Sequence, residues 1–498
     1  MAHTLVGGAG QPAAVHVPIA VGTRRHPAGT ADPLTVYTAL AERFGREDVY
    51  LLESVSGPDV DTRQSFVGFR ELLSVSVTRG VVRVTGVPAL VSEVHRRAAG
   101  VLDHAGGERV TSRALWDVLR AVHDCFDAAG SPSAFDFGFL AFFGYDTARY
   151  IEDLPFLIEQ EAVLPDVSLV LYQGHVRIGV DGGAELVLHD SAAWPGLDAG
   201  DLLPLLDAPP RADGPLPPSL ASDVSDSTTA ELYHESVERC LEHIAAGDIY
   251  QVQIGHEFTM RSTADPVDVY RRLRTRNPSP YMYLAPLAGH TVVGASPELF
   301  AKVEDSLVTM RPIAGTLPCG PDDEQEPTAA RRLREDPKEI AEHVMLVDLC
   351  RNDIGRICAP GTLDVPHMLV VERYSRLLHL VSTVVGRLDT GLDGYDVVAA
   401  LFPSGTMTGA PKVRAMEIIE AVETSRRGLY AGALGLMGLG GYVNLALCIR
   451  TLVHGDGVYR ARASAGVVAD STPRREWNET IAKLGAAHWA VTGEEPRA

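Results

Sequence analysis

The stretches PKEIAEHVMLVDLCRNDIGR (337–356) and ADSTPRREWNETIAKLG (469–485) each predict a helix rich in charged residues. The first helix is expected from about Asp336 to Leu349 and the second from about Pro473 to Trp489. Earlier in the chain, IYQVQIGHEF (249–258) alternates in the manner of a strand. These elements place most of the chain's distinctive chemistry in its second half.

Each of the two predicted helices carries a pair of glutamates three residues apart, Glu339 with Glu342 and Glu476 with Glu479. Residues at this spacing share a helix face, and like charges there repel each other unless a cation lies nearby. Oxygen ligands from two helices, with room for water and substrate, would suit Mg²⁺. The simpler interpretation is two solvated helix faces.

The chain has 498 residues, of which 44 are basic and 65 acidic, and its formal net charge is −21. This length is enough for one large domain or for two to three average ones. So acidic a chain is a poor candidate for coating nucleic acid or an anionic membrane. An anionic ligand would need local cations or a metal ion at its site.

Six cysteines lie far apart and form no CxxC pair, which argues against a structural zinc site and favours a reducing compartment, the cytoplasm. The N-terminal residues lack the pattern of a signal peptide. The uncharged stretch from Gly428 to Ile449 is long enough to span a membrane, but its six glycines favour buried strands with turns.

The chain divides by composition into four expected parts. Residues 1–30 are rich in Gly, Ala and Pro and are expected to form a flexible arm, and residues 31–190 mix helices with short strands. Residues 191–226 are dense in Pro, Asp and Ala and predict a linker or excursion. The catalytic region is expected over 227–492.

Shorter patterns predict further elements. Leu73–Val84 and Val167–Val180 alternate as strands do, and 291–303 with 307–313 predict a hairpin. Thr228, with Glu231 three residues later, has the spacing of a capping box at the start of a helix.

Several separated motifs, in one order, resemble the chorismate-utilising enzymes, and most nearly the large subunit (component I) of anthranilate synthase. Besides the two opening stretches, they are YLLES (50–54), SFVGF (65–69), GYDTARYIEDLP (144–155), RPIAGT (311–316), VERYSRLLHLVSTVVG (371–386), PSGTMTGAPKVRAMEII (403–419) and CIRT (448–451). The resemblance implies an α/β fold with two large stacked antiparallel sheets flanked by helices. It covers about 230–490 strongly, and the region before it more weakly.

The resemblance also implies a metal and substrate site. In the family, Mg²⁺ is held against the ring carboxylate of chorismate by one glutamate from each helix, which match Glu342 and Glu479, with Glu339 and Glu476 in support. A dianion that faces four carboxylates needs such a cation between them. The remaining positions that match substrate-binding groups are Thr316, Thr406, Gly409, Tyr430, Arg450, Ser464, Ala465, Gly466 and Lys483.

Glu298, in GASPE, matches the general acid that protonates the hydroxyl leaving ring carbon 4. A carboxyl in this role needs a raised pKa, which burial or nearby negative charge would supply. Relatives that add water carry a lysine base where this chain has Gln251, and para-aminating relatives usually carry lysine where it has Ala314. An amide cannot act as a base at neutral pH, so these positions favour ammonia and amination at ring carbon 2.

The resemblance leaves the final product open. Amination first yields 2-amino-2-deoxyisochorismate, and loss of pyruvate then yields anthranilate. His379 matches the residue tied to that elimination, which favours anthranilate. Three departures from the family pattern, at Ser464, at Leu436 and at 440–444, suggest a specialised paralogue of secondary metabolism that stops at the amino intermediate. The motifs also leave room for an isochorismate or salicylate synthase and for a non-catalytic chorismate-binding paralogue.

Two further implications concern regulation and partners. Leu52, Glu53 and Ser54, together with Pro280, Tyr281 and Met282, match the family's tryptophan feedback site. Because no segment of the sequence resembles a glutaminase with a Cys-His-Glu triad, ammonia is expected from a separate glutamine amidotransferase subunit. The sequence leaves open whether the chain forms a homo- or hetero-oligomer.

Overall fold

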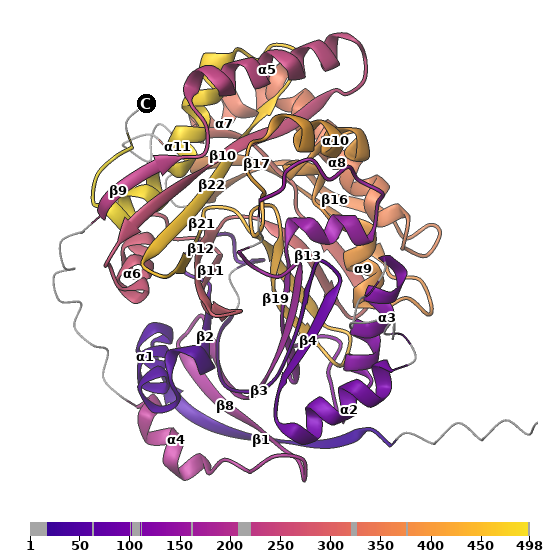
Figure 1. Cartoon of the computed structure of the whole chain (residues 1–498), viewed down its shortest axis with the longest axis vertical. Coiled ribbons are helices and arrows are strands. Elements are labelled where there is room, and N and C mark those ends of the chain that lie inside the picture. The colour runs from indigo at the N-terminus through magenta and orange to yellow at the C-terminus, as the bar shows by residue number, and fades with distance from the viewer. Residues whose placement is uncertain are drawn as a thin grey trace, which may run out of the picture.

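The computed structural model describes residues 17–496 apart from 62–63, 100, 102–109, 111, 161–162, 208–220, 320–325 and 375–376. It is a mixed α/β fold in which a large, mainly antiparallel sheet is flanked by helices (Figure 1). This is the expected fold class.

One continuous ladder of antiparallel strands runs through both halves of the sequence. In order of pairing it consists of β9 (Ala221–Asp226), β10 (Gln251–Ser262), β22 (Val458–Val467), β21 (Thr451–Gly455), β12 (His290–Ser296), β11 (Tyr281–Leu287), β2 (Val49–Glu53), β3 (Gln64–Thr78), β7 (Val167–Gly179), β6 (Gly138–Phe143), β19 (Ala433–Gly438), β20 (Val443–Leu447), β13 (Leu299–Glu304), β14 (Leu307–Met310), β17 (Leu377–Arg387) and β16 (Asp364–Tyr374). The N-terminal strands β2, β3, β7 and β6 therefore lie between strands of the C-terminal half.

Further strands pair with members of this ladder or with one another. They are β1 (Ile19–Thr30) on β8 (Gly183–Asp190), β8 on β7, β4 (Val81–Gly86) on β3, β5 (Phe126–Ala128) on β1, β15 (Ile313–Pro318) on β17 and β18 (Gly409–Ala410) on β10.

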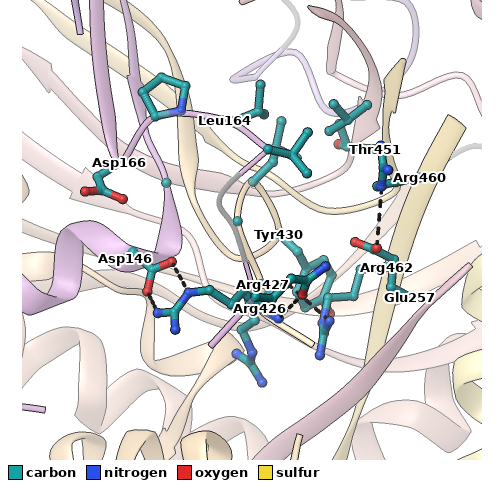
Figure 2. A pocket seen from close by; sticks show the side chains of 17 residues that line it. Asp146, Leu164, Asp166, Glu257, Arg426, Arg427, Tyr430, Thr451, Arg460 and Arg462 are labelled. Carbon is teal, nitrogen blue, oxygen red and sulfur yellow. Dashed lines mark hydrogen bonds and ion pairs between the residues drawn. The ribbon is translucent and has the colours of Figure 1, made fainter. Parts of the chain in front are cut away.

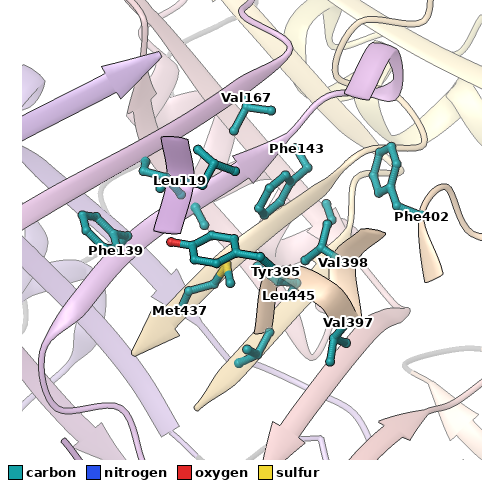
Figure 3. Close-up of a cluster of buried hydrophobic side chains, with 14 of the residues drawn as sticks. Leu119, Phe139, Phe143, Val167, Tyr395, Val397, Val398, Phe402, Met437 and Leu445 are labelled. Atoms are coloured by element: carbon teal, nitrogen blue, oxygen red, sulfur yellow. The ribbon is translucent and has the colours of Figure 1, made fainter. Parts of the chain in front are cut away.

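Alternate residues of the central strands face two different buried clusters. Phe139 and Phe143 of β6 pack toward helices, whereas Leu140 and Phe142 pack in a cluster drawn only from strands and loops. Strand-on-strand packing of this kind is what stacked sheets produce. Figure 3 shows the helix-facing cluster around Tyr395, where side chains from helices meet β6, β7 and β19.

Helices cover the outer faces of the sheet. In one cluster they are α2 (Pro88–Ala98), α3 (Ser112–His123), α8 (Pro337–Gly355) and α9 (Gly394–Leu401); in a second, α1 (Pro33–Phe44), α4 (Ala199–Leu206), α6 (Pro266–Arg276) and α11 (Pro473–Thr492). The helices α5 (Ala230–Ala245) and α10 (Lys412–Val422) pack over β10, and α7 (Glu326–Glu335) packs beside β17. The two glutamate-bearing helices are thus α8 and α11.

Several predicted elements are confirmed with shifted ends. The stretch 249–258 is the first part of β10, and the two glutamate helices extend further than predicted, to Gly355 and Thr492. The uncharged stretch 428–449 contains β19 and β20, as buried strands with a turn. No helix of the described residues is long and apolar enough to cross a membrane.

Other predictions were wrong in detail. Residues 19–30, expected in the flexible arm, form β1 because their backbone pairs with β8, while residues 1–16 lie outside the described ones. The run 291–303 breaks into β12 and β13 at Pro297, which has no N–H for a ladder. The cap of α5 is Thr229 rather than Thr228, and its hydroxyl accepts from the N–H of Leu232.

Two more expectations were coarser than the structure. Leu73–Val84 is two strands, the end of β3 and the start of β4. The expected linker 191–226 contains α4 and β9, and its residues 208–220 lie outside the described part of the chain.

Candidate active site

Strand β10 forms the floor of the candidate site through close backbone packing with its neighbours. Its Gln251 lies opposite Ala410 of β18, and its Gln253 lies opposite Gly466 of β22. Gly409 has φ +148°, and a Cβ there would overlap the carbonyl oxygen of Gln251. Only glycine permits this approach. The predicted positions Gln251, Gly409 and 464–466 are therefore brought together.

The Gln251 side chain is buried against this glycine-lined backbone. Its Nε2 lies 2.9 Å from the position that a Cβ of Gly466 would occupy. Its Oε1 is buried and has no hydrogen-bond partner among the described residues. Such an orphaned acceptor is uncommon in a protein interior, and a donor on a bound ligand or water would satisfy it.

Glu298 is buried at the break between β12 and β13, where it is 7% exposed. Burial raises the pKa of its carboxyl to about 7, although the hydroxyl of Thr406 donates to Oε1 at 2.9 Å and Lys483 and Arg450 lie near enough to oppose the rise. A carboxyl with this pKa is available in its protonated form near neutral pH. Glu298 therefore has the property that the general-acid role requires.

Arg450 reaches the same region from the loop between β20 and β21. Its backbone has φ +50°, and its guanidinium donates to the amide oxygen of Asn277 at 3.3 Å. Burial lowers the pKa of Arg450, and the charges of Glu298 and Tyr430 oppose that fall. A partly buried guanidinium hydrogen-bonded to a neutral amide is suited to receive an anion.

Lys483 joins helix α11 to β22. Its Nζ donates to the backbone oxygen of Ser464 at 2.9 Å and pairs with Glu479 at 2.7 Å. The Ser464 hydroxyl, on the same strand, donates to the phenol oxygen of Tyr430 at 2.8 Å. Four predicted site residues thus form one connected group.

Tyr430 also lines a small cavity of about 50 Å³. Figure 2 shows its ring beside the side chains of Arg427 and Arg462, with Arg426 paired to Asp146 further out. Arg427 and Arg462 both pair with the buried Glu423, at 2.8 Å and 2.7 Å. No motif in the sequence pointed to this arginine group.

Helices α8 and α11 bring carboxylates near one another, since Glu479 of α11 acts on both Glu339 and Glu342 of α8. Burial raises the pKa of Glu342, and the neighbouring carboxylates of Glu339 and Glu479 add to the rise. The pKa of Glu339 and that of Glu476 are raised for the same two reasons, burial first and neighbouring carboxylates second. These hard oxygen donors with excess negative charge fit a divalent cation.

The protein side chains alone do not complete such a site. Among the described residues, no three His, Cys, Asp or Glu side chains lie close enough together to hold a metal ion. These glutamates therefore suit a cation that binds one or two carboxylates and fills its other coordination positions with water or substrate, as Mg²⁺ commonly does.

His379 lies on β17, opposite Thr316 of β15. Its Nδ1 lies 3.0 Å from the backbone oxygen of Gly315, and burial lowers the pKa of the imidazole to about 4. The ring is therefore neutral near pH 7, and donation from Nδ1–H to the carbonyl makes Nε2 the basic nitrogen.

A buried charge cluster next to His379 was missed by the sequence analysis. The Arg311 guanidinium pairs with Asp61 and, at 2.6 Å, with Glu372, which lies opposite His379 across β16 and β17. The ring of Tyr374 contacts that of His379 edge-on, with 5.5 Å between centroids. Arg311, Glu372 and Tyr374 belong to motifs quoted for the resemblance, but nothing in the sequence pairs them with Asp61.

The six residues of the predicted tryptophan site lie on or beside two paired strands, because Leu52 of β2 lies opposite Tyr283 of β11 and Glu53 lies opposite Met282. All six line one cavity of about 240 Å³. The Glu53 carboxylate is already bound, by Tyr270 at 2.6 Å and Arg274 at 2.7 Å.

Two of the departures from the family pattern belong to this second cavity. Leu436 and Asn444, expected around the substrate cleft or its supporting strands, line the second cavity with the β2 and β11 residues. Only Ser464 of the departing positions lies in the connected group of the candidate active site.

Comparison with known proteins identifies the family. The model of the chorismate-binding enzymes matches residues 89–488. The chain belongs to the chorismate-binding enzyme family. Along 490 residues it is 61% identical to 2-amino-4-deoxychorismate synthase of Streptomyces globisporus, covering 97% of this chain and 98% of that protein. It is 39% identical to anthranilate synthase component 1 of Pseudomonas putida over 92% of each chain.

A solved structure supports the same assignment. Anthranilate synthase component I from Streptococcus pneumoniae superposes with a TM-score of 0.70 at 29% identity, covering 86% of this chain and 92% of that one. The resemblance read from the motifs and the predicted fold class are therefore confirmed. As a chorismate-binding enzyme, the chain has its candidate site within the matched region.

Proposed function

We propose that this enzyme aminates chorismate at ring carbon 2 and releases 2-amino-2-deoxyisochorismate. The observation that carries this proposal is the 61% identity, over nearly the whole of both chains, to a protein named 2-amino-4-deoxychorismate synthase. The two names describe one compound, a chorismate ring with an amino group at carbon 2 and no hydroxyl at carbon 4. The sequence pattern alone favoured anthranilate, so the comparison changes the preferred product.

The proposed step balances as a substitution with shifting double bonds. The lone pair of ammonia forms a bond to ring carbon 2, the two ring double bonds move, and the bond from carbon 4 to its hydroxyl breaks. Glu298 donates the proton with which that hydroxyl leaves as water, and its raised pKa supports this role. Because neutral ammonia carries its own lone pair, the amide of Gln251 need not act as a base.

The substrate's two carboxylates are placed by groups at opposite ends of the site. Arg450 and Tyr430 would hold the enolpyruvyl carboxylate, while Lys483, Thr316 and the backbone at 464–466 would serve the ring carboxylate. Glu342 and Glu479, supported by Glu339 and Glu476, would hold Mg²⁺. When bound, that cation would neutralise the ring carboxylate beside these glutamates.

Anthranilate synthase is the second candidate. The geometry of His379 favours it, because a neutral imidazole with a basic Nε2 could take the proton from ring carbon 2. The bond from carbon 3 to the enolpyruvyl oxygen would then break, the ring would become aromatic, and pyruvate would leave. The relatives named anthranilate synthase share less identity with the chain.

A product analysis tests the proposal. The purified chain is incubated with chorismate, Mg²⁺ and ammonium, and the products are separated by mass and fluorescence. We expect a non-fluorescent amino compound that retains the enolpyruvyl group, without stoichiometric pyruvate. Fluorescent anthranilate with one pyruvate per chorismate would instead establish the second candidate.

We further propose a partner and an effector. The ammonia would come from a separate glutamine amidotransferase subunit, so glutamine alone should not replace ammonium for the isolated chain. Tryptophan would bind the cavity between β2 and β11, supported by the convergence of all six predicted residues there.

A further inference from the structure

We infer that the hydrogen bond between Ser464 and Tyr430 determines which product leaves this enzyme. The inference rests on the proposed function, since it assigns the retention of the enolpyruvyl group to a contact within that site. Neither the family assignment nor the names of the relatives assigns this role to Ser464.

Ser464 connects two of the groups proposed to hold opposite ends of the substrate. Its side chain is 1% exposed, and its hydroxyl donates to the phenol oxygen of Tyr430 at 2.8 Å. Its backbone oxygen accepts from Nζ of Lys483 at 2.9 Å. The distance between the Tyr430 phenol and the Lys483 ammonium is therefore set through a single residue of a central strand.

The direction of the hydrogen bond determines what Tyr430 can do. A phenol that accepts from Ser464 keeps its own hydrogen for another acceptor. Hydroxyls in such a chain polarise one another, so the phenol becomes a better donor. An anion in the site, the enolpyruvyl carboxylate, is the acceptor that this arrangement suits.

Tyr430 has little freedom to follow a moving ligand. Its backbone N–H donates to the Arg427 carbonyl at 2.9 Å, and the Arg427 guanidinium lies 5.8 Å from the centre of its ring. Arg427 is in turn fixed by Glu423 at 2.8 Å. Together with the hydrogen bond from Ser464, these contacts hold Tyr430 at its backbone N–H, at its ring and at its phenol oxygen.

A fixed donor on the enolpyruvyl carboxylate opposes the elimination. That step breaks the bond from hydrogen to ring carbon 2 and the bond from carbon 3 to oxygen, forms a ring double bond, and requires the enolpyruvyl group to move away from the ring. While Tyr430 holds the carboxylate in place, the enolpyruvyl group resists separation from the ring. The elimination therefore slows relative to release of the whole amino product, which needs no bond to carbon 3 to break. Weakening the hold should therefore increase pyruvate release.

The test measures pyruvate released per chorismate consumed in Ser464→Ala and in Tyr430→Phe. Each variant removes one end of the hydrogen bond and keeps most of the side-chain volume. We expect the ratio to rise about three- to tenfold in both, the effect of losing one neutral hydrogen bond. Ser464→Thr, which keeps the hydroxyl, should retain the wild-type ratio.

Ser382→Ala is the matched control. Ser382 is fully buried, its hydroxyl lies 2.7 Å from Nε2 of His343, and it points to the face of β17 opposite His379. Loss of this hydroxyl removes two hydrogen bonds, the one with His343 and the one that the Leu369 N–H donates to it at 3.0 Å. Neither involves Ser464 or Tyr430, so the product ratio should stay unchanged.

The outcomes separate this inference from the proposed function. If the wild-type enzyme releases the amino product and both variants keep its ratio, the inference fails and the function stands. If the wild-type enzyme already releases anthranilate and pyruvate in equal amounts, both fail. Should Ser464→Ala not fold, Ser464→Gly decides the question, because it removes the same hydroxyl and leaves the Tyr430 phenol in place.

Discussion

At the scale of single residues, the environment of the Glu298 carboxyl sets the pH range in which it can act. Burial raises its pKa to about 7, so its protonated fraction falls as the pH rises through that value. A reaction that needs this proton should therefore slow above about pH 7, once the supply of neutral ammonia is held constant. A rate that rises steadily with pH at fixed ammonia concentration would contradict the assignment.

Substitution of Glu298 tests its role as general acid directly. Glu298→Gln keeps the size of the side chain and the acceptor for Thr406, which donates at 2.9 Å, but cannot give up a proton. We expect turnover to fall by ~10²–10⁴-fold, the usual contribution of a general acid. Chorismate binding, measured by calorimetry, should change little, and near-normal turnover would remove Glu298 from its role.

Single residues also mark the limit of prediction from sequence. The identity of the site residues followed from motifs such as GASPE and CIRT, and the structure brings Glu298, Arg450 and Lys483 near one another. The hydrogen bond from Ser464 to Tyr430 could not be predicted, because it joins residues 34 positions apart on different elements. Pairings of this kind depend on register and packing, which the local pattern does not contain.

At the scale of secondary-structure elements, helices α8 and α11 determine the charge of the site. Burial and neighbouring carboxylates raise the pKa of Glu342, and a bound cation would oppose that rise. Glu342→Gln or Glu479→Gln should weaken Mg²⁺-dependent chorismate binding by at least ~10-fold, the scale of loss at metal sites when even a supporting group is removed. Titration calorimetry at several Mg²⁺ concentrations measures this.

Glu238→Gln is the control for that pair. Glu238 is an exposed glutamate of α5, so the substitution makes the same change in net charge on a helix that carries none of the four glutamates. Equal weakening in the control would show a general charge effect and no metal site.

The pairing of β2 with β11 brings together the residues predicted to bind tryptophan. Because the predicted residues line one cavity of about 240 Å³, close to the size range of small-ligand pockets that begins at ~300 Å³, tryptophan binding there should be blocked by a bulky side chain. Ala134 lines the cavity from a loop, and Ala134→Trp should weaken tryptophan binding about tenfold or more, a change of ~1.4 kcal/mol. No tryptophan binding to the wild-type chain would contradict the proposal.

At the scale of the whole molecule, the ladder that joins both halves buries ionisable groups far from the site. His189 of β8 is 1% exposed, and burial lowers its pKa to about 4. The unfolded chain, with an ordinary histidine pKa of ~6.5, then binds more protons between about pH 4 and 6.5. Stability from this group is therefore complete above that range and is lost as the pH falls through it.

The contribution of His189 to stability can be measured by comparing the wild-type chain with a variant. Lowering the pH from 7 to 5 should cost the wild-type chain about 2 kcal/mol more than His189→Gln, whose side chain does not titrate. Thermal unfolding of both proteins at the two pH values measures the difference. Equal pH dependence in both would show that His189 is not buried in its neutral form.

The order in which the strands pair was the feature that the sequence predicted least. The motifs led to the fold class, and periodicity placed β10, α8 and α11 approximately. The insertion of β2, β3, β7 and β6 between β11 and β19 depends on pairing between residues hundreds of positions apart. Alternation of apolar residues indicates that a strand is buried but does not identify its neighbour.

The source of the new substituent tests the central claim most directly. The purified chain is supplied with chorismate, Mg²⁺ and ¹⁵N-ammonium in ordinary water, and the product is analysed by mass and by ¹⁵N-coupled NMR. We expect a ¹⁵N atom bonded to ring carbon 2 and loss of the hydroxyl from carbon 4. A product with oxygen at carbon 2 and no ¹⁵N would contradict it, because water rather than ammonia would then be the nucleophile.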